Sequence, residues 1–86
     1  MTDHAWDWID GAAALRRTFE FANFVEAFGF VTQVALLAQR HDHHPDITIS
    51  WNKVTICTTS HDTGNTVTER DHRLANAIDR LVVTDA

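Results

Sequence analysis

Residues 24–59, FVEAFGFVTQVALLAQRHDHHPDITISWNKVTICTT, decide the fold of this chain. The first half repeats apolar side chains at helical spacing, and Pro45 prevents the helix from continuing. The second half alternates apolar and polar residues and is rich in β-branched side chains, which is typical of strands. The stretch therefore predicts a helix over Phe24–Arg40, a rigid corner, and strands over 47–51 and 54–59.

The sequence before this stretch predicts a β-hairpin. Residues 6–9 are short and β-prone, Asp10-Gly11 is a favourable two-residue turn, and an alternating run follows over 15–21. The apolar side chains of that run share one face, on which Arg17 is an exception. Its aliphatic stem can lie over the sheet while the guanidinium stays at the rim. We expect two antiparallel strands with one covered face.

The sequence after it predicts a second helix. Thr68 opens this helix, and Asp71 three positions later completes a variant of the capping box. The apolar face of the helix consists of Leu74, Ala75, Ala77, Ile78, Leu81 and Val82. We expect residues 1–86 to form one α+β domain in the order β-β-α-β-β-α, with a four-stranded antiparallel sheet and two helices packed on one face.

Length, charge and cysteine content limit the class of function. The chain has 86 residues, a formal net charge of −5 and one cysteine. Its scattered basic residues form no face for nucleic acid, and no apolar run approaches the ~20 residues of a membrane span. The acidic N-terminus is unlike a signal peptide. A single cysteine excludes an internal disulfide framework and is typical of a reducing compartment, so we expect a cytoplasmic protein.

The first helix carries more apolar surface than one sheet can cover. Its apolar residues are Phe24, Val25, Ala27, Phe28, Phe30, Val31, Val34, Ala35, Leu36, Leu37 and Ala38. A surface helix with one wet face has a narrower apolar stripe. We expect a second copy of the chain to cover the surplus, giving a homodimer or homotetramer. A protein partner, if there is one, would bind the same Phe24–Arg40 helix.

Three of the six histidines are expected to converge. His43 and His44 precede the third strand and His61 follows the fourth, and these ends lie side by side in an antiparallel pair. Imidazoles titrate near pH ~6.5, so such a group can exchange protons at physiological pH. The alternative is a zinc site that also uses His41. Adjacent residues rarely point at one ion, however, and we expect no metal.

Four spaced blocks of the sequence resemble the pterin-4a-carbinolamine dehydratase family. They are QRHDHHPD at 39–46, WNKV at 51–54, TSH at 59–61 and TERD at 68–71. The similarity runs from about Trp8 to Leu81. The resemblance implies an enzyme that removes water from 4a-hydroxytetrahydropterin to give quinonoid dihydropterin, in tetrahydrobiopterin recycling, without a metal or an organic cofactor.

The resemblance also implies roles for individual residues. His43 and His61 resemble the general acids of the family, which protonate the departing hydroxyl. His44 resembles the residue that mainly binds the pterin. Asp71 resembles the carboxylate that orients one of these histidines. From the residues alone Asp71 is equally a helix cap, and the two roles are compatible.

Two further residues are expected to contact the substrate. Pro45 follows the histidine pair directly, and Trp51 retains the aromatic residue that the family has at this strand position. The resemblance thus implies a substrate contact for Trp51. From the residues alone a core position is the favoured alternative, because an aromatic residue on a strand is more often part of the core than a ligand platform.

The sequence departs from the family pattern at two positions. Gln39 stands where the family usually has an acidic residue, which removes a charge that could tune His43. Ile47 stands where the family often has an aromatic residue, which could remove part of a wall for the pterin ring. Members of the family also act as dimerisation partners of transcription factors or as assembly aids. A non-catalytic binding module is therefore the alternative function.

Overall fold

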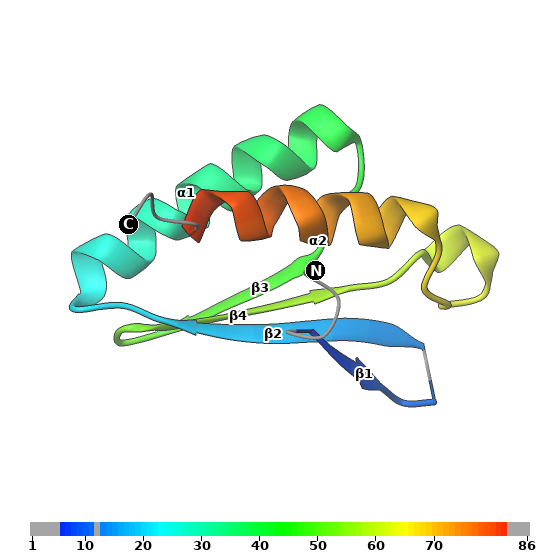
Figure 1. Ribbon diagram of the computed structural model, residues 1–86, viewed down its shortest axis with the longest axis horizontal. Helices are drawn as coiled ribbons and strands as arrows, with labels where there is room; N and C mark the ends of the chain where they lie inside the picture. The colour runs from blue at the N-terminus through cyan, green and yellow to red at the C-terminus, as the bar shows by residue number, and fades with distance from the viewer. Residues whose placement is uncertain (1–5, 12, 83–86) are drawn as a thin grey trace.

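The computed structural model describes residues 6–11 and 13–82. Its elements are β1 (Asp7–Ile9), β2 (Ala14–Glu20), α1 (Phe24–His41), β3 (Asp46–Ser50), β4 (Lys53–Thr58), the short 3₁₀ turn η2 (His61–Thr63) and α2 (Glu69–Val82). The strands form one antiparallel sheet in the order β1-β2-β4-β3. Both helices pack on one face of this sheet (Figure 1). The predicted fold class and element order are confirmed.

The core lies between the sheet and the two helices. On the central strands β2 and β4 every second side chain faces the helices, and Leu15, Phe19, Val54 and Ile56 are buried there. The helices add a second set of buried apolar residues, which includes Ala27, Phe30, Val34, Leu74, Ala75 and Ile78. The alternation read from the sequence therefore places the inner face correctly.

Arg17 finds a partner that the strand pattern does not reveal. Its guanidinium carbon lies 4.4 Å from the ring centroid of Phe19, and Nη1 donates to Oδ1 of Asp79 at 2.6 Å. The indole Nε1 of Trp6 donates to the same carboxylate at 2.9 and 3.1 Å. Asp79 is buried. The stem lies over the sheet as expected, but the charge is paired inside the fold.

The β1–β2 connection is longer than the expected two-residue turn. Asp10 and Gly11 have φ of 52° and 64°, in the left-handed region that such turns use. The pair of residues nearest the connection is Ile9 with Ala14, so more than two residues separate the paired strands.

The expectation that Trp51 belongs to the core is wrong. β3 ends at Ser50, one residue earlier than predicted, and Trp51 begins the turn that leads to β4. Its φ is 56° and its side chain is 63% exposed. Asn52 fixes this turn against the end of β2: its Nδ2 donates to the carbonyl oxygen of Phe21, and the Phe21 N–H donates to the Asn52 carbonyl oxygen, both at 2.8 Å.

Both ends of α1 are closed by specific hydrogen bonds. At the N-terminus Oδ1 of Asn23 accepts from the Glu26 N–H at 2.9 Å, which confirms the predicted cap. At the C-terminus Asp42 is left-handed, and the N–H of His43 donates to the Ala38 carbonyl oxygen at 3.0 Å. The helix therefore ends in a defined turn, and that turn fixes the backbone of His43.

The surplus apolar surface of α1 lies open in the single chain. The helix buries Ala27, Phe30, Val34 and Ala38. More than half of each of Phe24, Val25, Phe28 and Leu36 is exposed, and the rings of Phe24 and Phe28 stack with centroids 6.3 Å apart. Within the described residues neither helix combines the length and apolar character that a membrane crossing requires.

Candidate functional site

The three expected histidines line one hollow beside the open end of the β3–β4 hairpin. Its lining residues are Asp42, His43, His44, Thr59, His61, Asp62 and Arg70, and its volume is about 270 Å³. They come from the loop after α1, from the end of β4 with η2, and from the first turn of α2. The antiparallel pairing of β3 and β4 thus brings the histidines to one place, as their spacing predicted.

A larger hollow, of about 730 Å³, lies between the end of β2, the first half of α1 and the end of α2. Its titratable side chains are Arg17, Glu20 and Glu26, and neither histidine nor cysteine lines it. A reaction that needs proton exchange near neutral pH is therefore better served by the smaller hollow.

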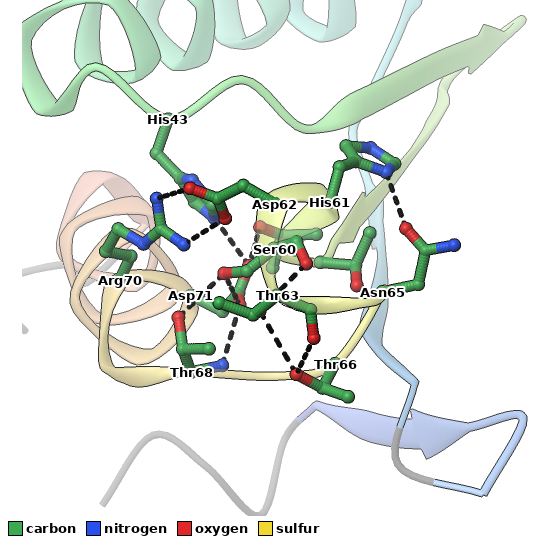
Figure 2. A network of polar contacts seen from close by, with 12 residues as sticks. His43, Ser60, His61, Asp62, Thr63, Asn65, Thr66, Thr68, Arg70 and Asp71 are labelled. Carbon is green, nitrogen blue, oxygen red and sulfur yellow. Dashed lines mark hydrogen bonds and ion pairs between the residues drawn. The ribbon is translucent and has the colours of Figure 1, made fainter.

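His43 is buried and is held by Asp71 (Figure 2). Its Nε2 lies 2.6 Å from Oδ1 of Asp71, which is itself fully buried in the first turn of α2. A carboxylate only accepts hydrogen bonds, so Nε2 carries the proton in the neutral ring. Within the described residues Nδ1 of His43 has no hydrogen bond comparable to that of Nε2.

The Asp71 carboxylate accepts four hydrogen bonds (Figure 2). Oδ1 accepts from His43 Nε2 and Thr58 Oγ1, both at 2.6 Å. Oδ2 accepts from Ser60 Oγ at 2.8 Å and from the Thr68 N–H at 2.9 Å. Burial alone would raise the pKa of Asp71, but these bonds hold it below its ordinary value. Asp71 is thus a buried anion that both caps α2 and contacts His43.

His44 and His61 are exposed and have neutral partners. Nε2 of His44 lies 3.1 Å from the amide oxygen of Gln39, and Nδ1 of His61 lies 2.8 Å from that of Asn65. Because an amide oxygen only accepts, these ring nitrogens are the donors. The neutral rings then present Nδ1 of His44 and Nε2 of His61 as acceptors. The sequence predicts that Gln39 removes a charge that could tune His43, but the side chain at this position contacts His44.

Sequence reasoning missed an ion pair at the rim of the hollow. Nη2 and Nη1 of Arg70 donate to the two oxygens of Asp62 at 2.5 and 3.1 Å. The hydrogen bond from Arg70 holds the pKa of Asp62 below its ordinary value, and the same bond raises that of Arg70. Exposed charged residues near the start of a helix form no recognisable sequence pattern. Asp62 and Arg70 come together only because η2 folds back beside α2.

The remaining predicted site residues lie outside the hollow. Pro45 is half-buried directly after His44. Trp51 lies at the turn end of the hairpin, separated from the hollow by the length of β3, roughly 17 Å at ~3.3 Å per residue. The half-buried side chain of Ile47 packs against the core. Within one chain, therefore, Trp51 does not share a site with the histidines.

The described residues contain no group of three His, Cys, Asp or Glu side chains arranged to hold one metal ion. His43, which the zinc alternative requires, has its Nε2 directed at Asp71. The arrangement is instead that of imidazoles with assigned donor and acceptor atoms, which suits proton transfer.

A sequence model of the family described as pterin 4 alpha carbinolamine dehydratase matches residues 1–81. The chain belongs to this family. A relative from Rhizorhabdus wittichii, provisionally named a pterin-4-alpha-carbinolamine dehydratase, is 47% identical over 76 residues, which cover 88% of this chain and 77% of the relative. One of the same provisional name from Rhodospirillum rubrum is 47% identical over 83 residues, covering 95% and 85%.

Solved structures show the same fold. The crystal structure of a transcriptional coactivator/pterin dehydratase from Brucella melitensis matches with a TM-score of 0.84 at 37% identity, covering 92% of this chain and 83% of that one. A pterin dehydratase-like protein identified as a RuBisCO assembly factor of the alpha-carboxysome matches with a TM-score of 0.78. At 21% identity, over 99% of this chain and 98% of that one, it supports the fold alone.

Proposed function

We propose that the protein is a dehydratase that removes water from 4a-hydroxytetrahydropterin and releases quinonoid dihydropterin, as a step of tetrahydrobiopterin recycling. One observation carries the proposal: the three histidines of the family motif line one small hollow, and one of them is anchored on a buried carboxylate. Membership of the pterin-4a-carbinolamine dehydratase family supports the choice of substrate.

The reaction needs an acid and a base. In a carbinolamine the hydroxyl and the amine nitrogen share one carbon. The C–O bond breaks as the hydroxyl takes a proton and leaves as water, the nitrogen loses its proton, and a C=N bond remains. In the proposal His43 and His61 act in their protonated form. Each gives the departing hydroxyl a proton from the ring nitrogen that its anchoring partner does not engage, and the neutral ring then accepts the proton that the amine nitrogen loses. Asp71 orients His43.

Binding is assigned to the exposed side of the hollow. His44 contacts the pterin, and Pro45 restricts the backbone of His44. We leave Trp51 out of the site, because it lies at the opposite end of the hairpin. The site we propose needs neither a metal nor an organic cofactor. The single cysteine supports a reducing, cytoplasmic compartment.

The test is the rate at which the purified protein dehydrates 4a-hydroxytetrahydropterin that an aromatic amino-acid hydroxylase generates in the same cuvette. The expected result is quinonoid dihydropterin formation well above the spontaneous rate, in proportion to protein concentration. A rate equal to the spontaneous one over a wide range of protein concentration would refute the proposal.

The exposed apolar face of α1 supports a second role as an oligomerisation or binding module. We propose that this face joins two copies of the chain in a homodimer, which can pair again into a homotetramer. A purely non-catalytic module would not depend on His61, because this residue lies in η2 and not on α1. Variants of His61 therefore distinguish the two functions.

A further inference from the structure

The inward positions of β4 change character where the strand approaches α2. Val54 and Ile56 are apolar and completely buried. The polar residues Thr58, at the end of β4, and Ser60, two residues after the strand, are each only 1% exposed. A hydroxyl buried in a core is unfavourable unless a partner satisfies it. Both hydroxyls have the same partner, the carboxylate of Asp71.

The protons of this cluster can be assigned one by one. The Asp71 anion carries no proton, so Ser60 donates its single hydroxyl proton to Oδ2. The contact between Ser60 Oγ and Thr68 Oγ1, at 2.7 Å, must then be donated by Thr68. Thr58 donates its own proton to Oδ1. The hydroxyls thus form a directed set: Thr58 and Ser60 donate to the carboxylate, and Thr68 donates to Ser60.

This cluster exceeds what a helix cap requires. Capping needs only the bond from the Thr68 N–H to Oδ2. Thr58 instead donates to Oδ1, the same oxygen that accepts from His43. Together with the Thr68 N–H, the two hydroxyls hold the carboxylate in the orientation in which Oδ1 accepts from the imidazole.

We propose that Thr58 and Ser60 are positioning residues for the dehydration. They orient Asp71 so that Nε2 of His43 keeps its proton and Nδ1 is the atom that exchanges a proton with the substrate. The inference rests on the proposed function only in the identity of the reaction. The orientation of Asp71 and the tautomer of His43 can be measured without a substrate.

The test compares Thr58→Val and Ser60→Ala with Thr55→Val. Thr55 lies on the same strand, and its hydroxyl bonds that of Thr18 at 3.0 Å, away from Asp71. We expect kcat to fall roughly tenfold to a hundredfold in the first two variants, the effect of losing one hydrogen bond to a charged acceptor. KM should stay within about twofold, and Thr55→Val should behave as wild type.

The second readout is the ¹⁵N chemical shifts of the His43 ring. At a pH at which the ring is neutral, wild type should show the proton on Nε2, and Thr58→Val and Ser60→Ala should show a mixture of tautomers. Thr58→Ser restores the hydroxyl and should restore both kcat and the single tautomer, which separates positioning from simple destabilisation. Unchanged kcat and tautomer in folded Thr58→Val and Ser60→Ala would overturn the proposal. If wild type lacks dehydratase activity, the tautomer alone decides it.

Discussion

Replacing Asp71 by Asn is the most informative single change, because it keeps the shape of the side chain and removes the charge. The carboxylate accepts two hydrogen bonds at each oxygen. An amide has only one oxygen, so its NH₂ group must face one of the two pairs of donors. On the Oδ2 side the Thr68 N–H cannot become an acceptor. On the Oδ1 side the Thr58 hydroxyl can rotate, and His43 can move its proton to Nδ1.

Asp71→Asn should therefore reverse the tautomer of His43 instead of leaving a donor unpaired. With the amide NH₂ group facing Nε2, the ring cannot keep a proton there while Nδ1 gives a proton to the substrate and takes one back. We expect kcat to fall by roughly 10²–10⁴-fold, the range for lost acid–base assistance. Exchanging charged for neutral acceptors should lower the free energy of unfolding at pH 7 by about 1–3 kcal/mol.

The stability deficit should depend on pH in a defined direction. The pKa of Asp71 in the folded chain is lower than its ordinary value of 3.8, so its contribution is present above that pH. The contribution disappears as the pH falls through the folded pKa, and the unfolding free energies of wild type and Asp71→Asn should then converge. Urea titrations at several pH values, with matched kcat measurements, provide the test.

Asp79→Asn is the matched control. Asp79 is also buried on α2 and also paired, but with Arg17 and Trp6, away from the histidine hollow. This variant should lose stability and keep its kcat. If Asp71→Asn kept wild-type kcat, or if Asp79→Asn lost as much activity as Asp71→Asn, the role given to Asp71 would be wrong.

Three further outcomes are expected. Leu36→Glu, on the exposed face of α1, should shift light-scattering mass toward the monomer at micromolar concentration, whereas Gln33→Glu should not; a monomeric wild type would exclude the proposed oligomer. Chelator treatment should change neither activity nor melting temperature, and stoichiometric zinc lost together with activity would contradict this. Trp51→Gly should be about 1 kcal/mol more stable than Trp51→Ala, because glycine relieves the left-handed backbone; equal stabilities would show no strain.

The fold can be predicted from the sequence because the hydrophobic periodicity and the residues typical of turns and helix caps indicate the same elements. The Asn23 cap and the strand alternation each identify an element without tertiary information. The convergence of His43 and His61 followed from antiparallel pairing alone. Trp51 departs from its expected core position because β3 ends one residue earlier than the alternation predicts, and one residue changes a strand position into a turn position.

The missed parts of the site depend on tertiary contacts. The Asp62–Arg70 pair joins η2 to α2, and neither residue belongs to a periodic pattern. The hydroxyls of Thr58 and Ser60 did carry a signal, because the inward positions of β4 turn from apolar to polar at the approach to Asp71. The change from apolar to polar residues predicts a polar cluster only if α2 is known to begin beside the end of β4, which is a tertiary contact.

The most direct test of the central claim is the dehydration rate of the His43→Ala, His61→Ala double variant beside each single variant. The account predicts that each single change lowers the rate by ~10²–10⁴-fold, with partial redundancy, and that the double variant barely exceeds the spontaneous reaction. A double variant that remains folded and dehydrates 4a-hydroxytetrahydropterin as fast as wild type would contradict the claim that these two histidines carry the reaction.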